Sequence, residues 1–387
     1  MKSNANDSRI LVLLNSLYTG GAEYSTLLFY GWLSKRGYDV RIVCCKEASP
    51  SYDPSTFGLN NATILKGSGF RFKLASLTTL INEFKPGLLH SVLFEANILG
   101  RFARFRNKNF IHVESLVNEV YSPFRLNDPN VTWLKLKGYQ MFDWATQLFG
   151  VDHFHANGNS VASHYREKLR IASRRITIIP RGRSANPFLH DAETRTAIRN
   201  EFGVDDNTVV LVTVGRHEFQ KGHDTLLEAL AQIKTPLNYV CFIVGREGRF
   251  TSVLRDKMST GALNDKVIFT GHRSDVARIL ASADAFVFPS RFEGLPGALI
   301  EAQSAGLPIV CSDIANNREV VSENENALIF PVNDSKALTE KLSVVLSDDA
   351  QRTAMGRKSL EIFQRTFQIE SIHERMESLI QTLLARA

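Results

Sequence analysis

Short apolar runs alternate along the chain with segments whose apolar residues recur at helical spacing. The first run, residues 10–14, has the length of a buried strand. A loop with two adjacent glycines follows, and residues 24–36 then carry apolar side chains on one face of a helix that Gly37 ends. The next apolar run, residues 40–45, completes a strand–helix–strand unit. Such units build parallel sheets, so the pattern predicts an α/β fold.

The same alternation continues to the end of the chain. Further strands are predicted at residues 88–93, 110–113, 176–179, 209–214, 239–244, 267–269, 285–288, 309–311 and 328–330, and further helices at 96–106, 224–233, 276–281, 296–305 and from 336 onward. Two consecutive arrays of this kind predict two doubly wound α/β domains, in which ligands bind at the carboxyl ends of strands. We expect an N-terminal domain at 1–188, a second domain at 189–365, and a C-terminal helix at 366–387 that packs back on the first domain.

The composition narrows the class of protein. Of the 387 residues, 44% are hydrophobic and 22% are charged, which is typical of a globular protein and excludes disordered and coiled-coil classes. No apolar run approaches the roughly 20 residues that span a bilayer. The four cysteines lie in or just after apolar runs, which favours buried thiols in a reducing cytosol over a disulfide framework. We therefore expect a cytoplasmic protein.

Charge is distributed unevenly along the chain. Residues 1–188 carry 24 basic and 13 acidic side chains, a net charge of +11, whereas residues 189–387 carry 22 and 27, a net charge of −5. The imbalance predicts an anionic partner for the first half: nucleic acid, an anionic membrane surface or a phosphorylated substrate. The densest basic stretch, residues 101–108, fits either a helix end with snorkelling arginines or a membrane contact. Nucleic acid is disfavoured because stacking platforms and a recognised motif are absent.

The loop and helix at residues 289–308 carry the first candidate chemistry. Glu293 lies in a Gly-containing loop after a predicted strand, and Pro296 suits the first turn of the helix that follows. The exposed N–H groups at such a helix start form an anion site that suits a diphosphate. Glu301 lies roughly 7 Å further along the helix axis, where a carboxylate can accept two ribose hydroxyls. Its apolar neighbours indicate a buried helix, in which a lone carboxylate needs a partner.

The loop at residues 214–224 carries the second set of candidate site residues. It also follows a strand and precedes a helix, for which Asp224 is the expected N-cap. Arg216 and Lys221 lie where they could clamp two phosphates, Arg with a planar fork and Lys as a point charge. Fixed cations stabilise a diphosphate leaving group more in the transition state than in the ground state.

These residues resemble the motifs of retaining glycosyltransferases of family 4, also described as glycosyl transferases group 1. The resemblance is carried by Arg216 with Lys221-Gly222, by Glu293 and Glu301 eight residues apart, by the Pro289-Ser-x-x-Glu293-Gly string, by Gly20-Gly-Ala-Glu23 and by Ile179-Pro-Arg-Gly182. It covers most of the chain. The resemblance implies the GT-B architecture, in which two Rossmann-like doubly wound domains face an interdomain cleft. It also implies that the domain at 1–188 binds the acceptor and that the domain at 189–365 binds the nucleotide-sugar.

The resemblance also implies a reaction and roles for single residues. A UDP- or GDP-linked sugar would be transferred with retention to a glycan or lipid-linked oligosaccharide in surface polysaccharide biosynthesis, at the cytoplasmic face of the membrane, without a metal or cofactor. Arg216 and Lys221 would hold the diphosphate, Glu301 the ribose, and Glu293 the sugar. The remaining candidate donor-binding residues are Gly215, Gly294, Leu295, Pro296, Arg273, Gly20 and Gly21, the last two because glycine lets the N-terminal loop approach the reacting centre.

The chain departs from the family pattern at two places. The family usually has a His near the sugar after the strand predicted at 110–113. Here strand alternation puts His112 and Glu114 on the same face, so either is the candidate catalytic residue. The family's usual Asp after the Ile-Pro-x-Gly motif is replaced by Arg183, which predicts added positive charge and an anionic acceptor or donor sugar.

Other functions compete with sugar transfer. A sugar-nucleotide epimerase can share the fold, and a non-catalytic nucleotide-sugar-binding protein could keep the donor motifs. An NAD-dependent oxidoreductase is disfavoured, because Gly245-x-x-Gly248 after a strand lacks the G-x-G-x-x-G pattern and a suitably spaced acidic residue.

Overall fold

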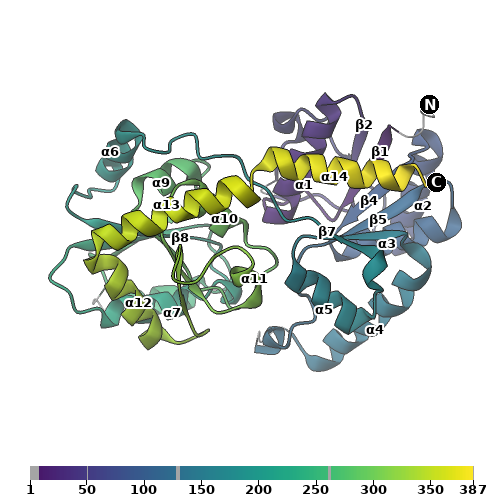
Figure 1. Cartoon of the computed structure of the whole chain (residues 1–387). Coiled ribbons are helices and arrows are strands. Elements are labelled where there is room, and N and C mark those ends of the chain that lie inside the picture. Colours follow the sequence, from purple (N-terminus) through teal and green to yellow (C-terminus); the bar gives the residue numbers. More distant parts are fainter. Residues whose placement is uncertain (1–7, 50, 128–130, 260–262, 387) are drawn as a thin grey trace. The chain divides into compact units, whose positions relative to one another are not determined.

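The computed structural model describes residues 8–49, 51–127, 131–259 and 263–386 (Figure 1). The chain divides into two compact units. Unit 1 comprises Met1–Arg181 and Glu370–Ala387, and unit 2 comprises Gly182–Ile369. The limits differ from those expected at 188 and 365, because backbone hydrogen bonds tie Arg183 to Phe367 and Ile369 within unit 2. Unit 1 carries 25 basic and 16 acidic side chains, a net charge of +9, and unit 2 carries 21 and 24, a net charge of −3.

Unit 1 is built on a parallel sheet. In the described residues its strands are β1 (Arg9–Leu14), β2 (Asp39–Cys44), β3 (Thr63–Ile64), β4 (Leu88–Val92), β5 (Ile111–Leu116), β6 (His153–Ala156) and β7 (Ile176–Ile178). Its helices are α1 (Gly21–Lys35), α2 (Phe70–Phe84), α3 (Phe94–Arg106), α4 (Trp133–Gly150), α5 (Asn159–Leu169) and α14 (Ile369–Leu384), with 3-10 turns η1 (Pro54–Phe57), η2 (Pro123–Asn127) and η3 (Ser173–Arg175). The strand order β3-β2-β1-β4-β5-β6-β7 reverses direction between β1 and β4, which is the topological switch point of the sheet.

Helices cover both faces of this sheet. Alternate side chains of β1 point to opposite faces, so Ile10 and Val12 lie in one core and Leu11 in the other. The first core includes residues of α1 and α14, and the second includes residues of α2 and α3. Although α14 follows unit 2 in the sequence, it packs on α1, where Arg36 forms a 3.0 Å ion pair with Glu377 (Figure 1).

Unit 2 repeats the plan with a second parallel sheet. Its strands are β8 (Val209–Val214), β9 (Tyr239–Val244), β10 (Val267–Gly271), β11 (Ala285–Phe288), β12 (Ile309–Ser312) and β13 (Ala327–Phe330). Its helices are α6 (Ala192–Glu201), α7 (His223–Gln232), α8 (Thr251–Met258), α9 (Val276–Ser282), α10 (Gly297–Ser304), α11 (Ala315–Arg318), α12 (Ser335–Ser347) and α13 (Asp349–Thr366), with the 3-10 turn η4 (Phe219–Lys221). The order β10-β9-β8-β11-β12-β13 places the switch point between β8 and β11. The two parallel sheets confirm the predicted α/β class with two doubly wound domains.

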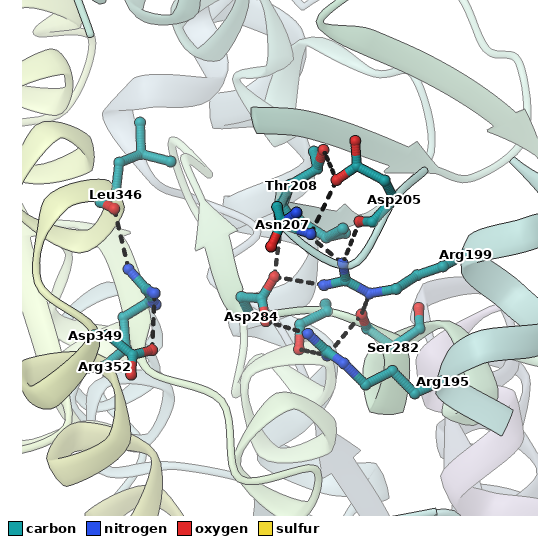
Figure 2. A network of polar contacts seen from close by, with 12 residues as sticks. Arg195, Arg199, Asp205, Asn207, Thr208, Ser282, Asp284, Leu346, Asp349 and Arg352 are labelled. Atoms are coloured by element: carbon teal, nitrogen blue, oxygen red, sulfur yellow. Dashed lines mark hydrogen bonds and ion pairs between the residues drawn. The ribbon is translucent and has the colours of Figure 1, made fainter. Parts of the chain in front are cut away.

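A buried polar network holds the amino ends of β8 and β11 together (Figure 2). Arg199 of α6 is buried, and its guanidinium lies 2.7 Å from Asp284, the residue before β11. It also donates to the carbonyl oxygens of Ser282 and Thr208. Arg195, one turn earlier on α6, lies 2.6 Å from the other oxygen of Asp284. This network fixes the sheet at the end opposite to the loops that carry the candidate motifs.

Candidate active site

The loops that follow β8 and β11 meet at the switch point of unit 2. Nζ of Lys221, at the end of the first loop, lies 2.6 Å from Oε1 of Glu293 in the second. Both side chains are largely buried, and Nζ also lies 5.4 Å from the ring centroid of Phe288, the last residue of β11. Two predicted site residues, Lys221 and Glu293, therefore form an ion pair at the carboxyl ends of the two central strands.

Backbone contacts lock the two loops together. Gly222 has φ +64°, and a Cβ at this position would lie 2.1 Å from the carbonyl oxygen of Pro289. Only glycine meets both demands. The backbone carbonyl of Gln220 accepts a hydrogen bond from the backbone N–H of Arg291 at 2.8 Å, and the side-chain Nε2 of Gln220 donates one to the Phe292 carbonyl at 2.8 Å. The position of Lys221 relative to Glu293 is thus set by the backbone.

Arg291 is a site-building residue that the sequence interpretation did not single out. Its guanidinium lies 2.7 Å from Asp224 and donates to the carbonyl of Phe219 at 2.6 Å. Asp224 is therefore not the N-cap of α7: the cap position is held by Gly222 and the helix begins at His223. The signal for Arg291 was its place inside the Pro289-Ser-x-x-Glu293 string, two residues before Glu293.

Helix α10 begins a few residues after Glu293, and its start presents backbone N–H groups. Gly294, Leu295 and Pro296 are buried, and Pro296 takes the N-cap position without a side-chain cap hydrogen bond. The first N–H groups of an α-helix have no partner within the helix, so this end can bind an anion.

Glu301, on the same helix, has a defined partner. Its Oε1 lies 2.6 Å from Nε of Arg183, whose side chain is nearly buried. The backbone of Arg183 accepts from Ile369 and donates to Phe367, so the cation is held at both ends. The sequence interpretation correctly required a partner for Glu301. It was wrong to expect free positive charge from Arg183, because Glu301 neutralises it.

Two other predicted site residues, Gly215 and Arg216, come directly after β8. At Gly215 a Cβ would lie 3.1 Å from Cδ of Lys221, so a small residue leaves room for the lysine stem. The side chain of Arg216 is 47% exposed, and its Nη1 lies 3.9 Å from a carboxylate oxygen of Glu218. Arg216 therefore lies in the same loop as Lys221, with about half of its side chain exposed.

Arg273 is not brought to this group. It follows β10, two strands away from β8 in the sheet. Its guanidinium is taken up by Glu201 at 2.5 Å and by Asp275 at 2.8 Å. These two carboxylates raise the pKa of Arg273, which marks a structural ion-pair cluster.

The glycines of unit 1 lie at its own switch point, where α1 begins after β1. Gly20 is the N-cap of α1, and a Cβ there would lie 2.7 Å from a carboxylate oxygen of Glu23. A Cβ at Gly21 would lie 3.2 Å from Nη1 of Arg181. The glycines thus give room to a carboxylate and a guanidinium that lie against this helix start.

His112 and Glu114 both face into the protein. His112 is fully buried, with Nδ1 2.5 Å from the Gly150 carbonyl and Nε2 2.8 Å from Oγ of Ser91. Burial lowers its pKa. Glu114 is fully buried as well and receives two hydrogen bonds from Arg101, at 2.5 and 2.7 Å. Strand alternation correctly put the two on one face, but that face packs on α3 and α4. The arrangement argues for structural roles and against contact with a substrate.

The unit 2 site combines two kinds of groups. Lys221, Arg216 and the start of α10 offer positive charge and N–H donors, while Glu293 and Glu301 offer acceptors for hydroxyls. Groups of three or more His, Cys, Asp or Glu residues that could hold a metal ion are absent from the described ranges. The arrangement suits a ligand that carries both a diphosphate and sugar hydroxyls.

Comparison with known families decides the class. The family model described as glycosyl transferases group 1 matches residues 194–361, and the model described as Glycosyltransferase Family 4 matches residues 19–186. The chain belongs to the family 4, group 1 glycosyltransferases. The resemblance drawn from the motifs is confirmed, and so is the class of transferase.

Relatives of this family include enzymes that act on lipid-linked sugars. The Escherichia coli UDP-Gal:alpha-D-GlcNAc-diphosphoundecaprenol alpha-1,3-galactosyltransferase is 24% identical over 92% of this chain and 92% of its own length. The Campylobacter jejuni N,N'-diacetylbacillosaminyl-diphospho-undecaprenol alpha-1,3-N-acetylgalactosaminyltransferase is 27% identical, and the match spans 45% of each chain.

A solved structure shares the fold. Anabaena HepE, crystallised in complex with UDP and glucose, superposes with a TM-score of 0.84 at 17% identity, over 97% of this chain and 99% of that one. The likeness extends through both units, and it confirms the GT-B fold for this glycosyltransferase.

Proposed function

We propose that this glycosyltransferase moves a sugar from a UDP-sugar to a lipid-linked oligosaccharide acceptor, with retention of anomeric configuration and without a metal ion. The observation that carries the proposal is the Lys221–Glu293 ion pair at the unit 2 switch point, followed in the sequence by the uncapped start of α10. Ligands of doubly wound sheets bind at this point.

Each part of the donor has a proposed partner. Lys221 and Arg216 bind the diphosphate, and the start of α10 adds N–H donors. Glu301 accepts the ribose hydroxyls while Arg183 holds its carboxylate in place. Glu293 faces the transferred sugar. GDP-sugars are the alternative donors.

The choice of uridine and of a lipid-linked acceptor rests on relatives. The Escherichia coli relative, which matches almost the whole chain, is named for a UDP-Gal donor and a diphosphoundecaprenol acceptor. The Campylobacter jejuni relative is also named for a diphospho-undecaprenol substrate. We propose that unit 1 binds the acceptor and that the reaction takes place in the cytoplasm, at the membrane face.

The bond changes define what the residues must do. The bond between the anomeric carbon and the diphosphate oxygen breaks, and the acceptor hydroxyl oxygen bonds to the same face of the sugar. The acceptor proton passes to the leaving diphosphate. Negative charge develops on that diphosphate, where Lys221 and Arg216 stabilise it. Since these cations are part of the protein, we propose that the reaction needs no divalent metal.

A transfer assay tests the proposal. The full chain is incubated with UDP-hexoses or UDP-N-acetylhexosamines and a polyprenyl-diphospho-sugar acceptor, with and without EDTA. We expect an acceptor product larger by one sugar in mass spectrometry, an anomeric configuration equal to that of the donor in NMR, and equal rates with EDTA. Donor turnover to an epimer without acceptor would contradict transfer, and an inverted product would contradict retention.

A further inference from the structure

Helix α4 of unit 1 turns polar residues inward and apolar residues outward. The side chains that it buries are Asp143, Thr146 and Gln147, with Gly150 at its end. Most of its exposed side chains are large and hydrophobic, among them Trp133, Leu134, Met141, Trp144, Leu148 and Phe149. Leu134 and Met141 are 74% and 70% exposed. An amphipathic helix on a globular protein normally has the opposite orientation, so this outer face calls for a partner.

Buried polar contacts fix the orientation. Oδ1 of Asp143 lies 2.5 Å from Nη1 of Arg101 on α3, which also donates to Thr146 at 2.8 Å. The rest of the Arg101 guanidinium binds Glu114. At Gly150 a Cβ would lie 2.5 Å from Cβ of Arg101, so the two helices approach closely. Rolling α4 to hide its apolar face would take Asp143 and Thr146 away from the buried Arg101 guanidinium, at a large cost.

The exposed surface extends beyond α4. The ring of Phe149 packs edge-on against Phe105 of α3 at 5.3 Å between centroids, and Tyr139 packs against Phe94 of α3 at 5.5 Å. Phe105 is 60% exposed, and Phe94 is also exposed. These side chains, together with those of the outer face of α4, form one surface that we call the α4 surface.

The charges of the α4 surface have one sign. The only acidic residue of α4, Asp143, is buried against Arg101, whereas Lys135 and Lys137 are exposed. Arg106 and Lys108, at the end of α3, are exposed as well. The basic stretch predicted at 101–108 therefore contributes less than expected: Arg101 is buried and Arg104 pairs with Asp152.

We propose that the α4 surface docks on an anionic lipid bilayer, with α4 lying in the plane of the headgroups. Tryptophan, tyrosine and lysine beside leucine and phenylalanine are the composition of interfacial helices. Within the described ranges, none of the helices has the length and hydropathy to cross a membrane, so the contact lies on the surface of the bilayer.

Charge favours a bilayer over a second copy of the chain. In a symmetric dimer this surface would meet itself, and Lys135 and Lys137 would find no exposed carboxylate on α4. Unit 1 as a whole has a net charge of +9. The inference deepens the proposed function, because a bilayer is where the enzyme would meet a lipid-linked acceptor, and only this point rests on the proposed function. The orientation of α4 does not depend on it.

Vesicle flotation tests the inference with the full chain. We expect binding to phosphatidylcholine vesicles that contain about a third phosphatidylglycerol. The binding should weaken in about 0.5 M salt, because the distance over which charges attract one another is then shorter than the roughly 8 Å of physiological ionic strength. Two of the three tryptophans of the chain, Trp133 and Trp144, lie on α4. Brominated lipids should therefore quench the fluorescence of the bound protein.

Matched variants separate this surface from general stickiness. The triple variant Leu134→Gln, Met141→Gln and Leu148→Gln keeps the charge and alters only exposed side chains. We expect its vesicle binding to fall at least about tenfold. The control variant carries Leu237→Gln, Val253→Gln and Val344→Gln, three exposed apolar residues of unit 2, and should bind like the parent.

Three results would overturn the inference. The first is that the protein neither binds the phosphatidylglycerol-containing vesicles nor is quenched by brominated lipids. The second is equal vesicle binding by both triple variants. The third is a concentration-dependent dimer that only the α4 triple variant abolishes, in a protein that does not bind vesicles. Sugar transfer to a short-chain, water-soluble acceptor is measured in parallel and should be unchanged in the α4 variant. Vesicle binding without any transfer would sink the proposed function and leave the docking surface standing.

Discussion

Arg183 and Glu301 form a 2.6 Å ion pair that joins the first segment of unit 2 to helix α10. The arginine is nearly buried, whereas the glutamate keeps about a third of its side chain exposed. One carboxylate oxygen is therefore anchored, and the carboxylate can still accept hydrogen bonds from a ligand. This relationship makes Arg183 a positioning residue for the proposed ribose contact.

Replacing Glu301→Gln should weaken UDP binding by about tenfold or more, since hydrogen bonds to a charged group contribute about 1.5–3 kcal/mol. The amide oxygen can still accept from Arg183, which protects the fold. In the parent, 2′-deoxy-UDP should bind more weakly than UDP, and in the variant the difference should shrink. Titration calorimetry measures both. Glu361→Gln, an exposed carboxylate on α13, serves as control; an equal preference for the 2′-hydroxyl in variant and parent would refute the ribose contact.

Replacing Lys221→Gln should lower the transfer rate by about 100-fold or more, because the cation at the leaving diphosphate is lost. The amide can still donate to Glu293, so circular dichroism and unfolding should show an intact fold. Lys257→Gln removes an exposed cation that pairs with Glu228 in the same unit and should leave the rate unchanged. Rates that fall equally in the two variants would remove Lys221 from the mechanism.

The sequence predicted most strands of the two sheets, because parallel strands buried on both faces are near-continuous apolar runs. It missed β3 and β6, which are short and carry polar residues. Residues 239–244 and 285–288 coincide with β9 and β11. Lys221 and Glu293 were also predictable as neighbours, because both follow central strands that end at the same edge. The partner of Glu301 could be demanded but not named, since Arg183 lies 118 positions away.

Elements with an unusual pattern escaped prediction. Helix α4 was not recognised, because it buries Asp143 and Thr146 and exposes its apolar side chains. Sequence spacing placed His112 and Glu114 on one face but gave no information about Arg101, the buried cation that binds Glu114. The ion pair between Arg273 and Glu201 could not be foreseen, because the two residues lie 72 positions apart in the sequence.

Replacing Arg199→Met should destabilise unit 2 by about 3 kcal/mol, since the substitution removes the buried guanidinium that pairs with Asp284 and donates to the carbonyl oxygens of Ser282 and Thr208 (Figure 2). Urea unfolding measures the loss. Arg318→Met breaks an exposed cluster with Asp313 and Glu323 and should cost at most about 1 kcal/mol. Equal losses in the two variants would contradict a structural role for the buried network.

Acid should destabilise unit 1 through buried histidines. Burial lowers the pKa of His155 to about 4 and that of His90 to about 3, while an unfolded His titrates near 6.5. Below about pH 6.5 the unfolded chain binds protons that the folded chain does not. The stabilisation is therefore complete above pH 6.5 and is lost as the pH falls toward 4, at up to about 1.4 kcal/mol per pH unit for each His.

The variant His155→Gln should show a shallower loss of stability between pH 6.5 and 5 than the parent. Urea unfolding across that range measures the slope. His272→Gln removes an exposed histidine and should run parallel to the parent. Identical slopes for all three proteins would contradict the assignment of His155 as a half-buried group that stays neutral in the folded protein.

The central claim is that the switch point of unit 2 binds the nucleotide diphosphate of a sugar donor. Titration of UDP into the full chain, with GDP in parallel, tests it most directly. We predict saturable binding of one UDP per chain, tighter than GDP, and weakened in both Lys221→Gln and Glu301→Gln. Absence of binding, or affinity that neither substitution changes, would contradict the account.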